Sequence, residues 1–221
     1  MFGPWGTFGC RSGFERNLPP GAVSSTESGS LDRAGHRQRY AVDMSGSRPT
    51  PASAWSVDNL RLPKALEGSE RGSALHAALR QNAHKLSDDG QLDVPRANWN
   101  PELAAVLLDT QRDGQLVRGL ELIEKTLERE ARGLSLADAR SATERGSRVS
   151  RLLLLSNDGS PRFYRQVERI VELQGVRVLA IRIDADANQF AAVVPDASGV
   201  VRAVLIQHKD SVARVLLSLY P

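Results

Sequence analysis

Hydrophobic and polar positions in the second half of the chain follow two patterns, continuous apolar runs and helical spacing. The run at 149–158, VSRLLLLSND, holds four consecutive leucines and ends in polar turn residues. A short apolar run bounded by turns is typical of a strand that is buried on both faces. Similar runs at 176–183 and 201–206 predict two more strands. We therefore expect a sheet with 149–158 at its centre.

Helical spacing fills the segments between and after these strands. The helix predicted for 160–174 begins at Ser160 and ends before Gly175. A short helix is expected at 186–194 and a closing helix at 210–219. The apolar residues expected on the inner face of the closing helix are Val212, Val215, Leu216 and Leu219. Alternation of strands and helices predicts an α/β layered domain.

Three further helices are predicted upstream. One covers 73–86, and the turn at 88–90 stops it. A second has Asn100 as its cap and Pro101 at its first position. A third covers 117–130 with apolar residues inward and charges of alternating sign outward. The segment between Glu130 and the central strand, 131–147, could add another short helix.

The first 71 residues differ in composition from the rest of the chain. They are rich in Ser, Gly and Pro and show no sustained hydrophobic period, so we expect residues 1–71 to be disordered. Met44 opens a sequence typical of a start, and we hypothesise that residues 1–43 are a misassigned leader. A helical accessory segment at 72–97 and a folded domain at 98–221 complete the predicted organisation.

Composition excludes several classes of protein. Net charge is +3, and residues 101–221 hold 17 Lys and Arg against 16 Asp and Glu, a net of +1. Any contact with phosphate therefore has to come from a local cluster of Lys or Arg side chains. The single cysteine, Cys10, excludes a disulfide framework. With no signal-like start and no stretch of membrane-spanning length, a cytoplasmic protein without a membrane partner is expected.

Three stretches occur in the order found in one superfamily. They are LAAVLLDTQRDGQLVRG at 103–119 followed by GLELIEKTLE, LLLLSNDGSP at 152–161, and the strand and helix at 200–217. The stretch at 103–119 with its continuation resembles a helix, a G-[KQ]-L-V-x-G turn and a further helix that carries G-x-N-E-x-x-K. The stretch at 152–161 resembles a strand followed by a helix start with the pattern x-x-D-x-x-P. Together they resemble the L-seven-Ae ribosomal proteins, their small bacterial relatives and the third domain of pelota-type release factors.

The resemblance implies a three-layer α/β/α sandwich with a small mixed sheet over about 101–221. It also implies an RNA site at the amino end of the second helix and the loop before the last strand. The positions carried over are Gly119, Glu121, Lys125, Ser160, Ser198, Gly199, Val200 and Val201. Gly119 would allow close backbone approach, and Lys125 would contact phosphate or a base edge. Glu121 and Leu122 stand where the family has asparagine and glutamate, and Ser160 replaces an acidic residue.

The function that the resemblance implies is a non-enzymatic RNA-binding module for structured, kink-turn-like RNA, such as that of the ribosome. A helix amino terminus suits phosphate because its N–H groups are free and its dipole is favourable. The alternative is a protein-interaction module of the release-factor third-domain type, which the replacements at Glu121 and Leu122 favour. Lys125 has an alternative role as the solvated partner of Glu121 at helical spacing. The oligomeric state is open.

Enzymatic chemistry finds little support in the sequence. Asp184 and Asp186 follow a strand as metal-binding pairs do, but partner residues are missing, and helix capping explains them as well. His208 follows a strand end without a marked nucleophile. We therefore expect no catalytic residue, no metal and no cofactor.

Overall fold

The computed structural model describes residues 55–88, 90–141, 148–194 and 199–220. Their strands form one six-stranded mixed sheet in the order β1-β2-β5-β4-β6-β3. The strands are β1 Ala83–Lys85, β2 Asp93–Asn98, β3 Leu116–Arg118, β4 Arg151–Leu155, β5 Val178–Asp184 and β6 Ala203–Ile206. The α-helices are α1 Glu70–Gln81, α2 Pro101–Arg112, α3 Leu120–Ser141, α4 Pro161–Gln174, α5 Ala187–Ala192 and α6 Lys209–Leu219.

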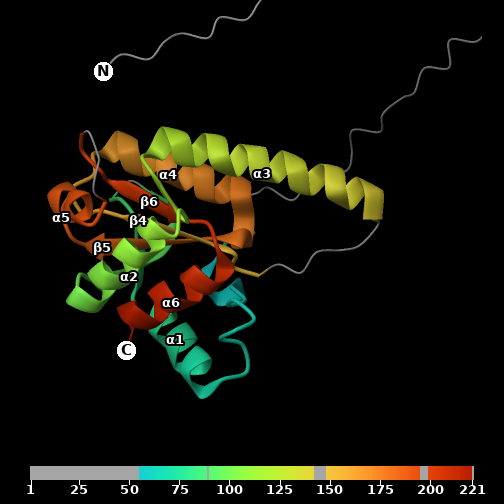
Figure 1. The fold of residues 1–221 in the computed structure, drawn as a ribbon, viewed down its shortest axis with the longest axis horizontal. Helices are drawn as coiled ribbons and strands as arrows, with labels where there is room; N and C mark the ends of the chain where they lie inside the picture. The colour runs from blue at the N-terminus through green and yellow to red at the C-terminus, as the bar shows by residue number, and fades with distance from the viewer. Residues whose placement is uncertain (1–54, 89, 142–147, 195–198, 221) are drawn as a thin grey trace, which may run out of the picture. The chain divides into compact units, whose positions relative to one another are not determined.

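Strand β4 is the predicted central strand. It pairs in parallel with β5 and antiparallel with β6, and its four leucines, Leu152 to Leu155, are fully buried. Helices α3 and α4 cover one face of the sheet, and α2 and α6 cover the other with α1 beside α6 (Figure 1). Helices cover both faces of the sheet because neither face of β4 can be left in water. The predicted α/β sandwich with a mixed sheet is thus confirmed.

The predicted tail boundary at residue 71 is wrong. Residues 55–69 contribute side chains to the core, and a short 3₁₀ helix, η2, covers Val57–Asn59. The Trp55 indole N–H donates to the Val178 carbonyl at 2.9 Å. The segment contributes five buried apolar side chains, those of Trp55, Val57, Leu60, Leu62 and Leu66. Their spacing follows neither a helix nor a strand, which is why the sequence pattern does not predict them. The rest of the predicted tail, with Met44 and Cys10, lies outside the described residues.

The predicted accessory segment at 72–97 is also part of the main domain. Helix α1 ends at Gln81, and β1 and β2 follow, so the boundary at 98 is wrong as well. Strand β2 pairs with β1 on one side and with β5 on the other. Pro95 lies within β2, and a proline normally argues against an inner strand. Pro95 and the polar residues of β2, which are Asp93, Arg96 and Asn98, explain why the sequence of this segment does not predict a strand.

Helix α3 begins later and ends later than predicted. Residues 116–118 form β3, and Gly119 has a φ of +80°, which turns the chain from strand into helix. The helix then continues into the segment 131–147 as far as Ser141, in place of the separate short helix considered there. Gly133 lies inside it with open space around its Cβ position. A mid-helix glycine destabilises a helix by about 1 kcal/mol relative to alanine. This explains why the sequence pattern predicts that the helix ends at residue 130.

Glu168 of α4 is a carboxyl group with an incomplete set of partners. Its Oε1 atom and the Ser87 hydroxyl are both buried without a hydrogen-bond partner among the described residues. Both atoms lie against Gly90. Burial raises the pKa of Glu168, and the backbone N–H of Leu92 offsets only part of this effect. The folded protein therefore holds this proton more tightly than the unfolded chain does.

We expect Glu168→Gln to be more stable than the native protein at pH 7. The folded state holds this proton more tightly than the unfolded state does. The native carboxyl therefore stabilises the folded protein below its ordinary pKa of 4.5, and this stabilisation is lost as the pH rises through the raised pKa. Glutamine stays neutral throughout, so its thermal midpoint should exceed the native one at pH 7 and approach it below about pH 4. Glu128→Gln, at an exposed position, is the control. If Glu168→Gln were less stable than the native protein at pH 7, a raised pKa of Glu168 would be contradicted.

None of the helices in the described part of the chain is long and apolar enough to cross a membrane.

Candidate functional site

The parallel strands β2, β5 and β4 all end at the same edge of the sheet. Strand β3 ends there too, and β6 begins there, because both β3–β6 and β4–β6 are antiparallel. We call this the carboxyl edge. Helices α2, α5, α4 and α3 follow β2, β5, β4 and β3 and therefore begin at this edge. It is thus the part of the fold where free helical N–H groups gather.

The amino end of α3 and the loop before β6 meet at the carboxyl edge. The Gly119 N–H donates to the Ala203 carbonyl at 3.0 Å, and the Ser156 N–H donates to the Arg202 carbonyl at 3.0 Å. The loop thus lies between the start of α3 and the end of β4. Val201 is buried, whereas Val200 is 63% exposed.

Two glycines at this edge have left-handed backbone conformations. Gly119 has a φ of +80° and Gly199 one of +104°, and no atom lies within 4 Å of a Cβ built at either position. The glycines are needed for their backbone conformation, since space is available around them. Ser198, the remaining predicted loop residue, lies outside the described residues.

Glu121 and Lys125 form an ion pair on the exposed side of α3. Lys125 Nζ lies 2.7 Å from Glu121 Oε1. The hydrogen bond with Lys125 lowers the pKa of Glu121, and the same bond raises the pKa of Lys125. Both side chains are largely solvent-exposed, so the pair adds little stability. The geometry matches the solvated pair considered from the sequence, and Lys125 is still free to exchange partners.

Ser160 has a structural role as the cap of α4, because its hydroxyl accepts the Phe163 N–H at 3.3 Å. The turn before it is fixed by Tyr164, whose hydroxyl donates to the Ser156 carbonyl and accepts the Gly159 N–H. Ser160 is nevertheless exposed at the amino end of α4, on the same edge as Gly119.

Helices α3 and α4 run parallel, with their amino ends side by side. Glu124 of α3 pairs with Arg169 of α4 at 2.8 Å, and further along Glu130 pairs with Arg177 at 3.1 Å. Two positive dipole ends therefore share one edge, an arrangement that an anion stabilises. Arg118 of β3 and Arg162 of α4 add positive charge there and form no ion pair within the described ranges.

Two described arginines that follow the 131–147 segment lie away from the carboxyl edge. Arg148 and Arg151 stand at the beginning of β4, at the opposite edge of the sheet. Arg148 pairs with Glu67, and Arg151 lies 2.9 Å from Glu130. Their role is to hold the surrounding segments together.

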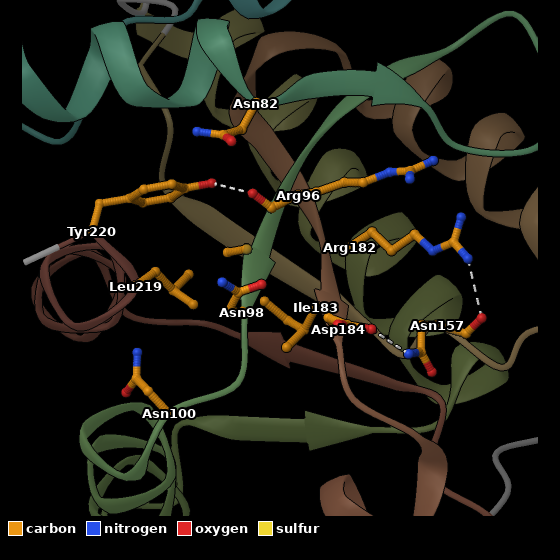
Figure 2. A pocket seen from close by; sticks show the side chains of 11 residues that line it. Asn82, Arg96, Asn98, Asn100, Asn157, Arg182, Ile183, Asp184, Leu219 and Tyr220 are labelled. Carbon is orange, nitrogen blue, oxygen red and sulfur yellow. Dashed lines mark hydrogen bonds between the residues drawn. The ribbon is translucent and has the colours of Figure 1, made fainter.

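A further group of polar residues at the carboxyl edge was not predicted. An open cavity of about 710 Å³ lies at the ends of β2 and β5. Figure 2 shows its lining, which includes Asn82, Arg96, Asn98, Asn157, Arg182, Asp184 and Tyr220. Arg182 interrupts the apolar run of β5, and a charged residue in a buried strand, together with Asp184 at the end of that strand, is the sequence signal that could have found this cavity.

The residues considered for metal or acid–base chemistry have other partners. Asp186 caps α5 in a reciprocal capping box with Gln189, and Asp184 accepts the Asn157 side-chain N–H at 2.6 Å. His208 caps α6, since its Nδ1 accepts the Asp210 N–H at 3.4 Å. Among the residues that the structure covers, no cluster of three His, Cys, Asp or Glu side chains is placed to hold a metal ion.

Comparison with known proteins adds little. No family model matches the chain, and no curated protein matches it. A solved structure of a protein with unknown function from Bacillus halodurans C is similar over 55% of this chain and 100% of that chain. Its sequence identity is 9% and its TM-score is 0.40, a level of similarity from which we conclude nothing about function.

Proposed function

We propose that this protein is a non-enzymatic RNA-binding module that recognises structured, kink-turn-like RNA, such as that of the ribosome, through its carboxyl edge. The observation that carries the proposal is the meeting of Gly119, the amino end of α4 and the loop 199–202 at one edge. The L-seven-Ae resemblance associates Gly119, Ser160 and residues 198–201 with RNA. It supports the proposal independently of the geometry.

The edge has the physical properties that an RNA backbone requires. Free N–H groups and two adjacent dipole ends attract phosphate. Arg118 and Arg162 supply charges that no carboxylate neutralises within the described ranges. Phosphate contacts of this kind position RNA, whereas apolar contacts to unstacked bases favour particular shapes. Val200, with its exposed side chain, is available for such a contact.

The test is a salt series of binding by the full chain. A hairpin that forms a kink-turn is compared with a straight duplex of the same length. Binding that prefers the kinked form and weakens as salt rises supports the proposal, because displaced counterions make phosphate contacts salt-dependent. Equal affinity for both RNAs, or no binding at low salt, would overturn it.

Arg162→Gln is expected to weaken binding to the kinked hairpin by about three- to tenfold and to reduce the salt slope by about one. The side chain is exposed in the first turn of α4, so the fold should not change. Arg129→Gln is the matched control, since Arg129 is an exposed arginine of α3 outside the first turn. Equal effects of the two substitutions would exclude a specific contact at Arg162.

One observation favours the alternative of a protein-interaction module of the release-factor third-domain type. Leu122 and Val200 are 51% and 63% exposed, and both belong to segments of the carboxyl edge. Exposed apolar side chains beside a pair such as Glu121 and Lys125 also suit a protein surface. Loss of all RNA binding with a folded protein would direct the search to such a partner.

A further inference from the structure

Arg96 and Arg182 stand side by side at the carboxyl edge, away from the residues predicted to contact RNA. They are direct neighbours in the parallel pairing of β2 and β5. Side chains at paired positions point to the same face of a sheet, and Figure 2 shows both arginines extending to the same side of the two strands. Both line the 710 Å³ cavity.

The two guanidinium groups are fixed by neutral groups only. Arg182 donates to the carbonyls of Leu86 and Asn157, at 3.3 Å and 3.1 Å, and lies 5.0 Å from the centre of the Tyr164 ring. Arg96 donates to the Lys85 carbonyl at 3.2 Å. Neither arginine has a carboxylate partner in the part of the chain that the structure describes. Two neighbouring like charges repel each other, and an anion between them would remove that repulsion.

The rest of the lining offers neutral and acidic groups at short range. Asn98 and Asp184 form the pair two residues further along β2 and β5, which in a strand is the next pair on the face of the arginines. Asn98 forms no side-chain hydrogen bond within the described ranges, so its amide is free to bind a ligand. Asp184 can accept a hydroxyl or amine hydrogen, and it keeps its bond to Asn157 through one oxygen.

We propose that this cavity binds a nucleotide, with its phosphate between Arg96 and Arg182 and its sugar or base toward Asn98 and Asp184. Guanidinium groups match phosphate geometrically, and ligands of open α/β sheets bind at the carboxyl ends of parallel strands. The volume lies within the range of small-molecule sites. The nucleotide is either free or an unstacked residue of an RNA chain. The free form does not depend on the proposed RNA function.

The first experiment titrates the full chain with adenosine 5′-monophosphate by calorimetry, with adenosine as the ligand lacking phosphate. Arg96→Gln should weaken binding of the monophosphate by about tenfold. Arg96→Lys should restore part of the affinity, because lysine still supplies a point charge. Arg129→Gln should leave it unchanged. Arg96 is exposed, so these variants should retain the native circular dichroism spectrum.

The second experiment measures binding of the same variants to the kinked hairpin. If the nucleotide belongs to RNA, Arg96→Gln weakens hairpin binding about tenfold while the free monophosphate binds poorly. If it is free, the monophosphate binds even when no hairpin does, which separates this site from the RNA proposal. If Arg96→Gln and Arg129→Gln have the same affinity for the monophosphate and the same affinity for the hairpin, the inference is overturned.

Discussion

Replacing Trp55 with alanine is expected to lower the free energy of unfolding by about 3–5 kcal/mol, the usual cost of removing a large buried aromatic side chain. Trp55 is only 6% exposed, and its indole N–H donates to the Val178 carbonyl at the start of β5. Trp55→Phe should cost less, about 1–3 kcal/mol, because it keeps most of the ring and loses the hydrogen bond. Urea-induced unfolding of the full chain measures both.

Leu173→Ala is the control for this prediction. Leu173 lies on α4 but is 65% exposed, so its truncation should change stability by less than about 0.5 kcal/mol. If Trp55→Ala had an effect as small as that of Leu173→Ala, residues 55–69 would not be part of the core. A large effect would show that any shorter form of the domain has to begin before Trp55.

The parts of the fold that the sequence predicts are those with a strong local pattern. Strand β4 is a continuous apolar run between turns, and α4 begins and ends with the cap and glycine that the sequence indicates. Strand β3 is too short to show a period, and β2 contains Pro95 among polar residues. Their strand conformation depends on pairing with β6 and β5, which are distant in sequence. Local patterns do not contain that information.

The candidate site follows the same rule. The resemblance to a known family assigns Gly119 and residues 198–201 to one site, and in the structure Gly119 and residues 199–201 of that loop lie at one edge. Arg96 and Arg182 carry no motif, and only the register of β2 against β5 makes them neighbours. Sequence reasoning could have noticed Arg182 in an apolar strand, but it could not have found its partner.

The position of α3 depends on a cluster of charges at the end of the sheet opposite the carboxyl edge. Glu130 accepts hydrogen bonds from Arg151 Nε at 2.9 Å and Arg177 Nη1 at 3.1 Å. The three side chains are only 20–22% exposed. Burial lowers the pKa of Arg177, and the charge of Glu130 works against this effect. The cluster thus holds α3 against the sheet while the helix continues to Ser141.

Glu130→Gln is expected to destabilise the protein by about 2–4 kcal/mol, because two partly buried arginines lose their counter-charge while the side-chain volume is kept. Glu128→Gln, two residues earlier in α3, is the control. Its ion pair with Arg132 is 3.7 Å long and solvent-exposed, so its loss should cost less than about 1 kcal/mol. Urea is the denaturant of choice, since guanidinium salts would screen both pairs.

A double-mutant cycle separates the charge interaction from other effects of the substitution. Arg177→Gln removes one of the two cations that face Glu130, so the double variant should lose less than the sum of the two single variants, with a coupling of about 1–3 kcal/mol. Additive losses would mean that Glu130 stabilises α3 without its charge. If the coupling is found, weakened RNA binding by Glu130→Gln would follow from a displaced α3, since Glu130 lies at the far end of the sheet from Gly119.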